Sequence, residues 1–125
     1  MIDVHCHLNF PSLKEKLDEV VANAKREMKA VITCGLVNDA QQAIELHKMY
    51  NDFIYITLGV HPEDVVAMRD EQIERHIEFI RANRRYIVGI GEIGLDYKWI
   101  KEPDAIKKCK EHFRKFLDLA ADLRL

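Results

Sequence analysis

Residues 2–8 read Ile2-Asp3-Val4-His5-Cys6-His7-Leu8, an apolar run in which polar side chains occupy alternate positions. Three further runs rich in β-branched residues follow at a spacing of roughly 25 to 35 residues, which is the size of one βα unit. They are Ala30–Leu36, Phe53–Val60 and Tyr86–Ile93. Short apolar runs of this kind, each followed by turn residues, predict four buried β-strands.

Helical patterns separate these runs, with apolar residues recurring at intervals of three and four positions. The helical stretches extend over Leu13–Ala24, Ala40–His47, Ile73–Arg81 and Ile106–Leu123, and Pro103 suits a first helical turn. The order β-α-β-α-β-α-β-α predicts an α/β fold, with a parallel sheet, right-handed crossovers and outer helices. Because the sequence has 125 residues and no linker, we expect a single domain over residues 1–125.

Composition restricts the class of protein. Hydrophobic residues make up 48% and charged residues 32%, which is enough to form a core and argues against disorder. The 19 Lys and Arg residues oppose 21 Asp and Glu residues, so there is no overall basic footprint for nucleic acid. No apolar run approaches the roughly 20 residues of a membrane span, and no signal peptide is recognisable, so no membrane partner is expected. Three scattered cysteines predict free thiols in a reducing, cytoplasmic compartment.

His5 and His7 are the first candidate metal ligands. Side chains alternate between the faces of a strand, so both imidazoles are expected to project the same way, together with Asp3. Two neighbouring imidazoles can chelate one divalent ion. Six histidines give roughly 0.3 such pairs by chance in a chain of this length, so the pair alone leaves metal binding and coincidence evenly matched.

Glu92 lies in the fourth run, within Gly91-Glu92-Ile93-Gly94-Leu95-Asp96-Tyr97. A carboxylate inside an apolar strand is costly to bury unless it is paired or bound to a cation. Gly91 and Gly94 indicate close approach of the backbone at this point. If Glu92 faces His5 and His7, the three side chains offer two nitrogens and one oxygen. The alternative is an ordinary glutamate at the rim of the sheet.

His61 follows the third run, in Gly59-Val60-His61-Pro62, where a strand passes into a loop. Parallel α/β folds bind their ligands at that end of the strands. A polar contact to substrate and a solvated loop histidine are equally compatible with this position.

The remaining reactive side chains are expected to have structural roles. Surface or packing positions are predicted for His47, His76 and His112, core positions for Cys6, Cys34 and Cys109, and a loop or cap position for Asp96. Tyr97 and Trp99 could stack on a base, but aromatic residues after a strand more often fill a loop, and we expect that role.

Three of these motifs occur together in one enzyme family. The stretches Ile2–Leu8, Gly59–Pro62 and Gly91–Tyr97 resemble, in this order, those of the TatD family of metal-dependent deoxyribonucleases, and the similarity extends over the whole chain. The first motif is shared with other hydrolases, including amidohydrolases, whereas the third is far more specific. The resemblance implies a TIM-type (β/α)8 barrel that hydrolyses phosphodiester bonds of DNA with a metal-activated water.

The resemblance also implies roles for individual residues. His5 and His7 would bind metal, Glu92 would bridge two divalent ions and take part in catalysis, and His61 would be a catalytic residue beside them. Two ions about 4 Å apart lower the pKa of a bound water and offset phosphate charge, so the protein surface need not be basic. Mg²⁺, Mn²⁺ and Zn²⁺ are all candidates, and mixed imidazole and carboxylate ligands favour Mn²⁺ or Zn²⁺.

Length is the point at which this sequence departs from the family. A TIM barrel has eight strands and about 250 residues, whereas four strands are predicted here, so we expect an N-terminal (βα)4 half-barrel. The two histidines and the aspartate that the later family strands supply have no counterpart. Two open sheet edges predict a partner, which is either the missing half-barrel or a second copy of the chain in a homodimer.

Three functions remain open at this point. The chain is a TatD-like nuclease, a related hydrolase of another ester or amide, or a non-catalytic half-barrel that binds metal or a partner chain. Metal-dependent DNA cleavage that His5→Ala abolishes would distinguish the first from the other two.

Overall fold

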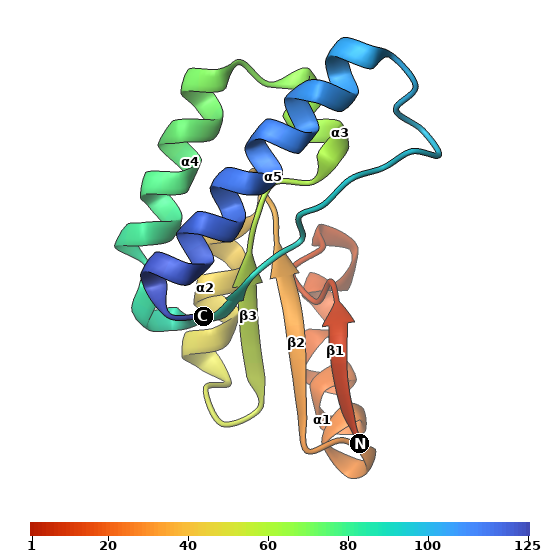
Figure 1. The fold of residues 1–125 in the computed structure, drawn as a ribbon. Coiled ribbons are helices and arrows are strands. Elements are labelled where there is room, and N and C mark those ends of the chain that lie inside the picture. Colours follow the sequence, from red (N-terminus) through yellow and green to blue (C-terminus); the bar gives the residue numbers. More distant parts are fainter.

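The fold is a four-stranded parallel sheet with alternating helices (Figure 1). A computed structural model describes all residues from 1 to 125. The strands, in the same order along the chain and across the sheet, are β1 (Ile2–Cys6), β2 (Ala30–Gly35), β3 (Ile54–Leu58) and β4 (Ile87–Ile90). Every neighbouring pair is parallel and the strands keep their chain order, as the sequence predicted and as in one half of a TIM-type barrel.

Helices follow each strand. They are α1 (Leu17–Glu27), α2 (Ala40–Met49), α3 (Pro62–Ala67), α4 (Asp70–Ala82) and α5 (Pro103–Leu123), with 3-10 turns at Pro11–Lys16 and Arg84–Tyr86. The sequence did not predict α3, because a helix of six residues is too short to show a periodic apolar stripe. The other four helices match the predicted stretches. No helix combines the length and the apolar character that a membrane span requires.

The core lies between the sheet and the helices. Along β3, the buried side chains of Ile54, Ile56 and Leu58 alternate with the partly exposed Tyr55 and Thr57. This period of two shows that one face of β3 is covered and the other is open. The covered face packs into a single cluster with buried side chains of the helices, among them Ala43, Ile44, Ile73, Ile80, Phe116 and Leu119.

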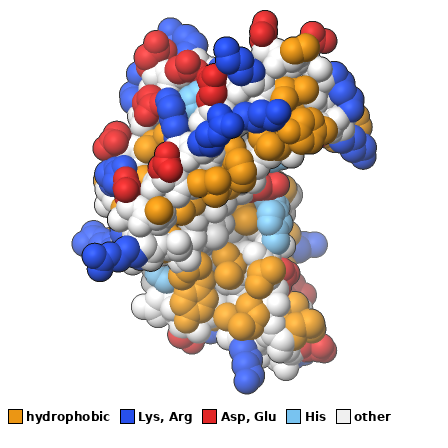
Figure 2. All heavy atoms as spheres, viewed as in Figure 1, with side chains coloured by type: hydrophobic (Ala, Val, Ile, Leu, Met, Phe, Trp, Pro, Cys, Tyr) orange, Lys and Arg blue, Asp and Glu red, His pale blue; other side chains and the backbone are white.

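Both edges of the sheet are unpaired. β1 and β4 each have a neighbouring strand on one side only. Ile2 and Val4 of β1 and Val88 of β4 are exposed, although such β-branched side chains are usually covered. Figure 2 shows apolar side chains gathered over the lower part of the molecule, where Figure 1 places the strands. Open edges and apolar surface of this kind are where further strands can pair.

The end of β1 is irregular. Asp3 pairs with Val31 and Cys6 pairs with Thr33, so three steps along β1 oppose two steps along β2. A shift of this kind breaks the alternation of side chains between the faces. The expectation that Asp3 shares a face with the two histidines stays a prediction. Its carboxylate accepts a hydrogen bond from the backbone N–H of His5 at 3.0 Å.

Ion pairs hold α4 against α5. Asp70 lies 3.1 Å from Nε2 of the buried His112 and 3.6 Å from Nζ of Lys108, and Arg81 lies 3.3 Å from Asp122. The hydrogen bond from His112 is the main cause that lowers the pKa of the Asp70 carboxyl. His112 therefore has a packing role, as predicted. These contacts fix the position of α5 and of the loop that precedes it.

His76 is also a buried packing residue. Its ring stacks on Phe79 with the ring centroids 5.7 Å apart. Burial lowers the pKa of the imidazole, and a hydrogen bond to the backbone of Gly59 opposes this effect only in part. The folded protein therefore holds His76 neutral at a pH where the unfolded chain is already protonated.

A pH-dependent contribution to stability follows from His76. Since its folded pKa lies below the ordinary value of 6.5, protons bind preferentially to the unfolded chain. We predict that the free energy of unfolding decreases as the pH falls through and below 6.5, and that His76→Phe makes this decrease shallower. Denaturant unfolding at about pH 7.5 and about pH 5 measures both slopes. Equal pH dependence in the two proteins would contradict the assignment.

Candidate metal centre

The carboxyl ends of three strands bring four polar side chains together. His5 lies in β1 and His7 directly after it, His61 follows β3, and Glu92 follows β4. Parallel strands end at the same edge of a sheet, so residues distant in sequence meet there. Glu92 was predicted to lie inside the fourth strand, and this was wrong because β4 ends at Ile90. The loop after β4, and not the strand itself, carries the carboxylate to the site.

The carboxylate of Glu92 faces three imidazoles. Its Oε2 lies 3.6 Å from Nε2 of His5 and 3.8 Å from Nε2 of His7, and its Oε1 lies 3.7 Å from Nε2 of His61. Ligand atoms of His5, His7 and Glu92 lie within 4.8 Å of one another. The two carboxylate oxygens thus face different histidines, with the His5–His7 pair on one side and His61 on the other.

Lysine and arginine are absent from this cluster. The ion pairs of Glu92 are with the three histidines only. The surroundings of the cluster are also negatively charged. The pKa of the neighbouring Cys34 thiol is raised mainly by burial, and the carboxylates of Glu92, Asp3 and Asp39 raise it further. No side chain with a permanent positive charge therefore balances this partly buried carboxylate. A divalent cation would balance it, and two nitrogens with one oxygen form a donor set that Mn²⁺ and Zn²⁺ accept. The residues present therefore fit a metal ion.

His5 is oriented by a pair of neighbouring strands. Its Nδ1 lies 3.7 Å from Sγ of Cys34 on β2, and this sulfur accepts a hydrogen bond of 3.4 Å from the hydroxyl of Thr57 on β3. With Nδ1 turned toward the sheet, Nε2 faces Glu92. Cys34 is buried as predicted, but its contact with His5 was not anticipated.

His7 is held by its ring. The imidazole stacks on Phe10 with ring centroids 5.0 Å apart and planes inclined by 16°. Its Nδ1 is buried and has no hydrogen-bond partner, while its Nε2 faces Glu92. Stacking thus fixes the plane of the ring with Nε2 directed into the cluster.

His61 differs from the other two histidines. As the residue before α3, it accepts a hydrogen bond at Nδ1 from the backbone N–H of Glu63 at 3.3 Å. A neutral imidazole that accepts at Nδ1 carries its proton on Nε2, which here faces Glu92. Between the two roles that the sequence left open, His61 is therefore part of the site, placed as a donor beside the carboxylate.

Thr33 fixes the turn that follows His7. Its buried hydroxyl accepts a hydrogen bond from the backbone N–H of Leu8 at 2.9 Å. The same hydroxyl lies 2.9 Å from Oδ1 of Asn9 and 3.1 Å from the carbonyl oxygen of Cys6. Sequence reasoning missed this residue, although a threonine within an otherwise apolar strand was a signal of a buried polar contact.

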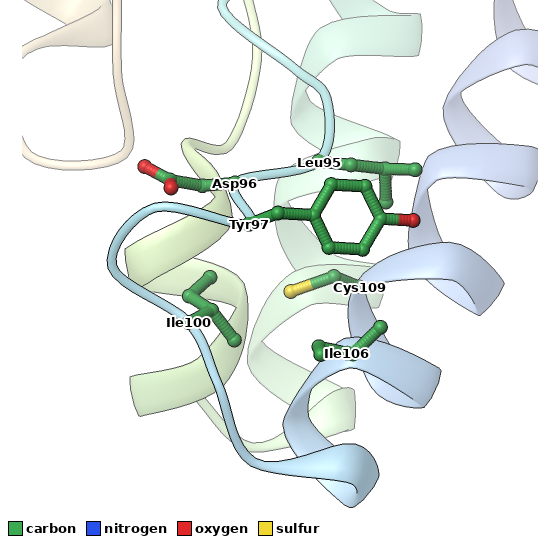
Figure 3. A pocket seen from close by; sticks show the side chains of 6 residues that line it. All are labelled: Leu95, Asp96, Tyr97, Ile100, Ile106 and Cys109. Atoms are coloured by element: carbon green, nitrogen blue, oxygen red, sulfur yellow. The ribbon is translucent and has the colours of Figure 1, made fainter.

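The pocket beneath the loop between β4 and α5 is lined by Ile100 and Tyr97 but not by Trp99. Ile100 is buried, whereas Tyr97 and Trp99 are 54% and 67% exposed. Figure 3 shows Ile100, Ile106 and Cys109 lining the pocket beneath this loop, with the carboxylate of Asp96 directed away from it. Tyr97 lines this pocket together with Ile100, so it helps to fill the loop as expected, whereas Trp99 does not line it and the expectation for Trp99 was wrong.

A comparison with known families identifies the chain. The model of the family described as TatD related DNase matches residues 2–125. This chain belongs to the TatD family. An uncharacterised metal-dependent hydrolase of Methanocaldococcus jannaschii is 40% identical over 123 residues, which are 98% of this chain and 47% of that protein. Human deoxyribonuclease TATDN3 is 29% identical over 105 residues, which are 78% of this chain and 38% of that protein.

The fold comparison agrees with the family. A crystal structure of the TatD homologue YjjV from Escherichia coli superposes with a TM-score of 0.82 at 23% identity, covering 100% of this chain and 48% of that one. The TatD-family chain described here thus spans about half the length of the relatives that it matches. The resemblance seen in the sequence and the half-barrel fold are both confirmed.

Replacement of Thr33 tests the support of His7. We predict that Thr33→Val, which keeps the shape of the side chain, lowers the free energy of unfolding by about 1–3 kcal/mol, because the N–H of Leu8 loses its partner. Chemical denaturation measures this difference. The matched control is Thr57→Val on the adjacent strand, where the lost bond is to a sulfur, and we expect it to cost less than about 1 kcal/mol. Equal losses in the two variants would contradict the role given to Thr33.

Gly59 permits the position of Glu92. A Cβ atom at Gly59 would lie 2.5 Å from the carbonyl oxygen of Glu92 and 2.6 Å from the carbonyl carbon of Gly91, which are backbone atoms that cannot rotate away. We predict that Gly59→Ala displaces Glu92 and weakens metal binding about 10-fold or more, as loss of supporting contacts typically does. Isothermal titration with Mn²⁺ provides the measurement.

Gly89→Ala is the control for Gly59→Ala. A Cβ atom at Gly89 meets only the Cγ2 methyl group of Thr57, at 3.3 Å, and lies on the strand before the site. Metal affinity within about 3-fold of the parent chain is expected for this variant. Similar losses of affinity in both variants would show that the contact with the Glu92 backbone has no special effect.

Proposed function

We propose that this TatD-family chain contributes the metal-binding half of a nuclease that hydrolyses phosphodiester bonds in DNA. The observation that supports this most directly is the convergence of His5, His7 and Glu92, with ligand atoms within 4.8 Å of one another. Membership of a family of TatD-related DNases supports the reaction class, and one relative is named a deoxyribonuclease.

His5, His7 and Glu92 are the proposed metal ligands. Because the two oxygens of Glu92 face opposite groups of histidines, we propose that this carboxylate is shared between two divalent ions. Bound there, Mg²⁺, Mn²⁺ or Zn²⁺ would supply a water of lowered pKa and positive charge opposite the phosphate oxygens. The two imidazole nitrogens favour Mn²⁺ or Zn²⁺ over Mg²⁺.

Glu92 and His61 are the proposed catalytic residues. As a carboxylate shared between two ions, Glu92 would hold both ions, and with them the metal-activated water, over the ends of the strands. Nε2 of His61 carries a proton and lies 3.7 Å from Oε1 of Glu92, so it could donate to a phosphate oxygen bound beside the cluster. Glu92 would thus place the ions that activate the water, and His61 would supply a hydrogen-bond donor to the phosphate.

The unpaired edges of the sheet favour a structural partner that supplies further strands to this half-barrel. β1 and β4 each lack a neighbour on one side, and Val4 and Val88 are exposed beside those edges. We propose that four further parallel strands close the barrel, supplied either by further chain or by a second copy in a homodimer. Closure would remove both edges and cover the apolar inner face.

The chain is proposed to act as a single domain in the cytoplasm. All buried hydrophobic residues except Cys34 join one core cluster, which supports one structural unit over residues 1–125. The three cysteines are unpaired, which suits a reducing compartment, and Cys34 and Cys109 are buried.

Removal of one metal ligand tests the proposed activity. We predict that Mn²⁺-dependent cleavage of a DNA oligonucleotide decreases at least about 100-fold in His5→Ala, because one of two nitrogen ligands is lost. The control is His47→Ala, which removes an imidazole that contacts the carbonyl oxygen of Ile54 at 2.7 Å, away from the cluster. Gel analysis of a labelled strand, with and without a chelator, measures both rates.

The same assay separates the alternative functions. Metal uptake by calorimetry without cleavage of DNA would favour a non-catalytic half-barrel, for which the small set of three ligands is the supporting observation. Cleavage of small phosphoesters or amides in preference to DNA would favour a related hydrolase. DNA cleavage that His5→Ala leaves unchanged would contradict the proposed nuclease site.

A further inference from the structure

A thiol lies behind one of the proposed metal ligands. Sγ of Cys34 on β2 is 3.7 Å from Nδ1 of His5 on the neighbouring strand β1, a separation that suits the large radius of sulfur. Cys34 is not among the side chains whose ligand atoms meet in the cluster, which are His5, His7 and Glu92. The sulfur therefore acts on the centre through the imidazole of His5.

The sulfur is itself held from the next strand. The hydroxyl of Thr57 on β3 donates a hydrogen bond of 3.4 Å to Sγ of Cys34. Three neighbouring strands thus carry a continuous row of polar contacts from Thr57 through Cys34 to His5. The hydroxyl occupies one lone pair of the sulfur. The second lone pair and the S–H group are left to face the imidazole.

The two histidines of the first motif differ in what their second ring nitrogen meets. Nδ1 of His7 is buried without a hydrogen-bond partner, and the ring is held by its stacking on Phe10. Nδ1 of His5 faces the thiol. Metal-binding histidines usually donate their second N–H to an outer partner, which fixes the tautomer and the orientation of the ring. Of the two, only His5 has such a partner.

A thiol can serve both tautomers of His5, because it is a donor and an acceptor. When no cation is bound, Nε2 of His5 faces the carboxylate of Glu92 at 3.6 Å, and this negative charge favours a proton on Nε2. Nδ1 then accepts from the S–H group. A cation at Nε2 requires the ring proton on Nδ1, which then donates to the sulfur. The proton leaves Nε2 to water and another reaches Nδ1 from water, so the ring stays neutral.

We propose that Cys34 is a positioning residue that holds His5 as a metal ligand, through a hydrogen bond whose direction reverses when a divalent cation binds. The inference rests on the proposed function, because it takes His5 as a ligand. The bond from Thr57 keeps the sulfur in place in both states. The sulfur stays outside the coordination sphere, since it faces Nδ1 and not the Nε2 that is directed at Glu92.

Matched cysteine variants test the effect on metal affinity. Cys34→Val removes the sulfur but keeps a side chain of similar size, and we expect calorimetry to show Mn²⁺ bound at least about 10-fold more weakly. Cys34→Ser keeps a group that donates and accepts, so its affinity should stay within about 3-fold of the parent.

Cys109→Val is the control for the loss of a buried thiol. Cys109 and Cys34 are both 3% exposed, and the Cys109 thiol donates to the carbonyl oxygen of Pro62 and contacts none of the three proposed ligands. This variant should bind Mn²⁺ like the parent. Unchanged affinity in Cys34→Val, or equal losses in Cys34→Val and Cys34→Ser, would overturn the role of the hydrogen bond.

Nitrogen NMR of the parent chain tests the reversal without any variant that could fail to fold. Long-range correlation of carbon-bound protons with ring nitrogens separates protonated from unprotonated nitrogens, and the His5 signals are those missing in His5→Gln. We predict a proton on Nε2 in the presence of a chelator and on Nδ1 after saturation with Zn²⁺, which is diamagnetic. The same tautomer under both conditions would overturn the reversal.

Cobalt tests whether the sulfur is itself a ligand. A thiolate bound to Co²⁺ gives an intense charge-transfer band in the near ultraviolet, whereas imidazole and carboxylate ligands do not. We expect the chain loaded with Co²⁺ to lack this band. A band that is present in the parent and lost in Cys34→Ser would overturn the outer position of Cys34.

The outcomes separate this inference from the proposed function. A chain that cleaves DNA with Mn²⁺ and keeps its affinity in Cys34→Val would overturn the role of Cys34 and leave the nuclease assignment intact. A chain that binds Mn²⁺, loses affinity in Cys34→Val and cleaves no DNA would overturn the nuclease assignment and leave the role of Cys34 in place. A parent chain that binds no divalent ion would overturn both.

Discussion

The site depends on the close approach of two strand exits. The chain leaving β4 passes so near to Gly59, after β3, that a single added carbon would lie 2.5 Å from the carbonyl oxygen of Glu92. This approach carries Glu92 over the ends of the other strands and places its carboxylate 3.6 to 3.8 Å from three imidazoles. Gly59 has no side chain to bind a metal, yet its close approach to the Glu92 backbone constrains where the carboxylate lies. The backbone packing at this end of the sheet therefore determines whether the proposed metal ligands can meet.

Charge is the second constraint on this arrangement. Glu92 has no lysine or arginine partner, and the carboxylates of Asp3 and Asp39 add negative potential at the neighbouring Cys34. A centre of this kind is stabilised by a bound cation, which also faces an anionic substrate without a basic protein surface. This explains how a chain of net charge −2 fits a family of DNases.

The sequence predicted those features that repeat or that carry rare chemistry. Apolar runs at βα spacing predicted all four strands and their parallel order, and the resemblance of three motifs to the TatD family predicted the half-barrel and the meeting of His5, His7, His61 and Glu92. Features that depend on one contact escaped prediction. The register shift in β1 follows from its pairing with β2, the exposure of Trp99 follows from Ile100 filling the loop, and the contact of Cys34 with His5 requires both strands to be in place. Each of these contacts joins residues that are distant in sequence or depend on the folded loop, so the pattern around one residue does not predict it.

The central claim is that Glu92 completes a metal centre with the two histidines of β1. Electron paramagnetic resonance of Mn²⁺ tests it most directly, because free and protein-bound ions have distinct spectra and no substrate is needed. Titration of the chain and of Glu92→Gln, which keeps the size of the side chain but removes its charge, should show Mn²⁺ bound by the parent and at least about 10-fold weaker binding by the variant. Equal binding by both proteins, or none by the parent, would contradict the account.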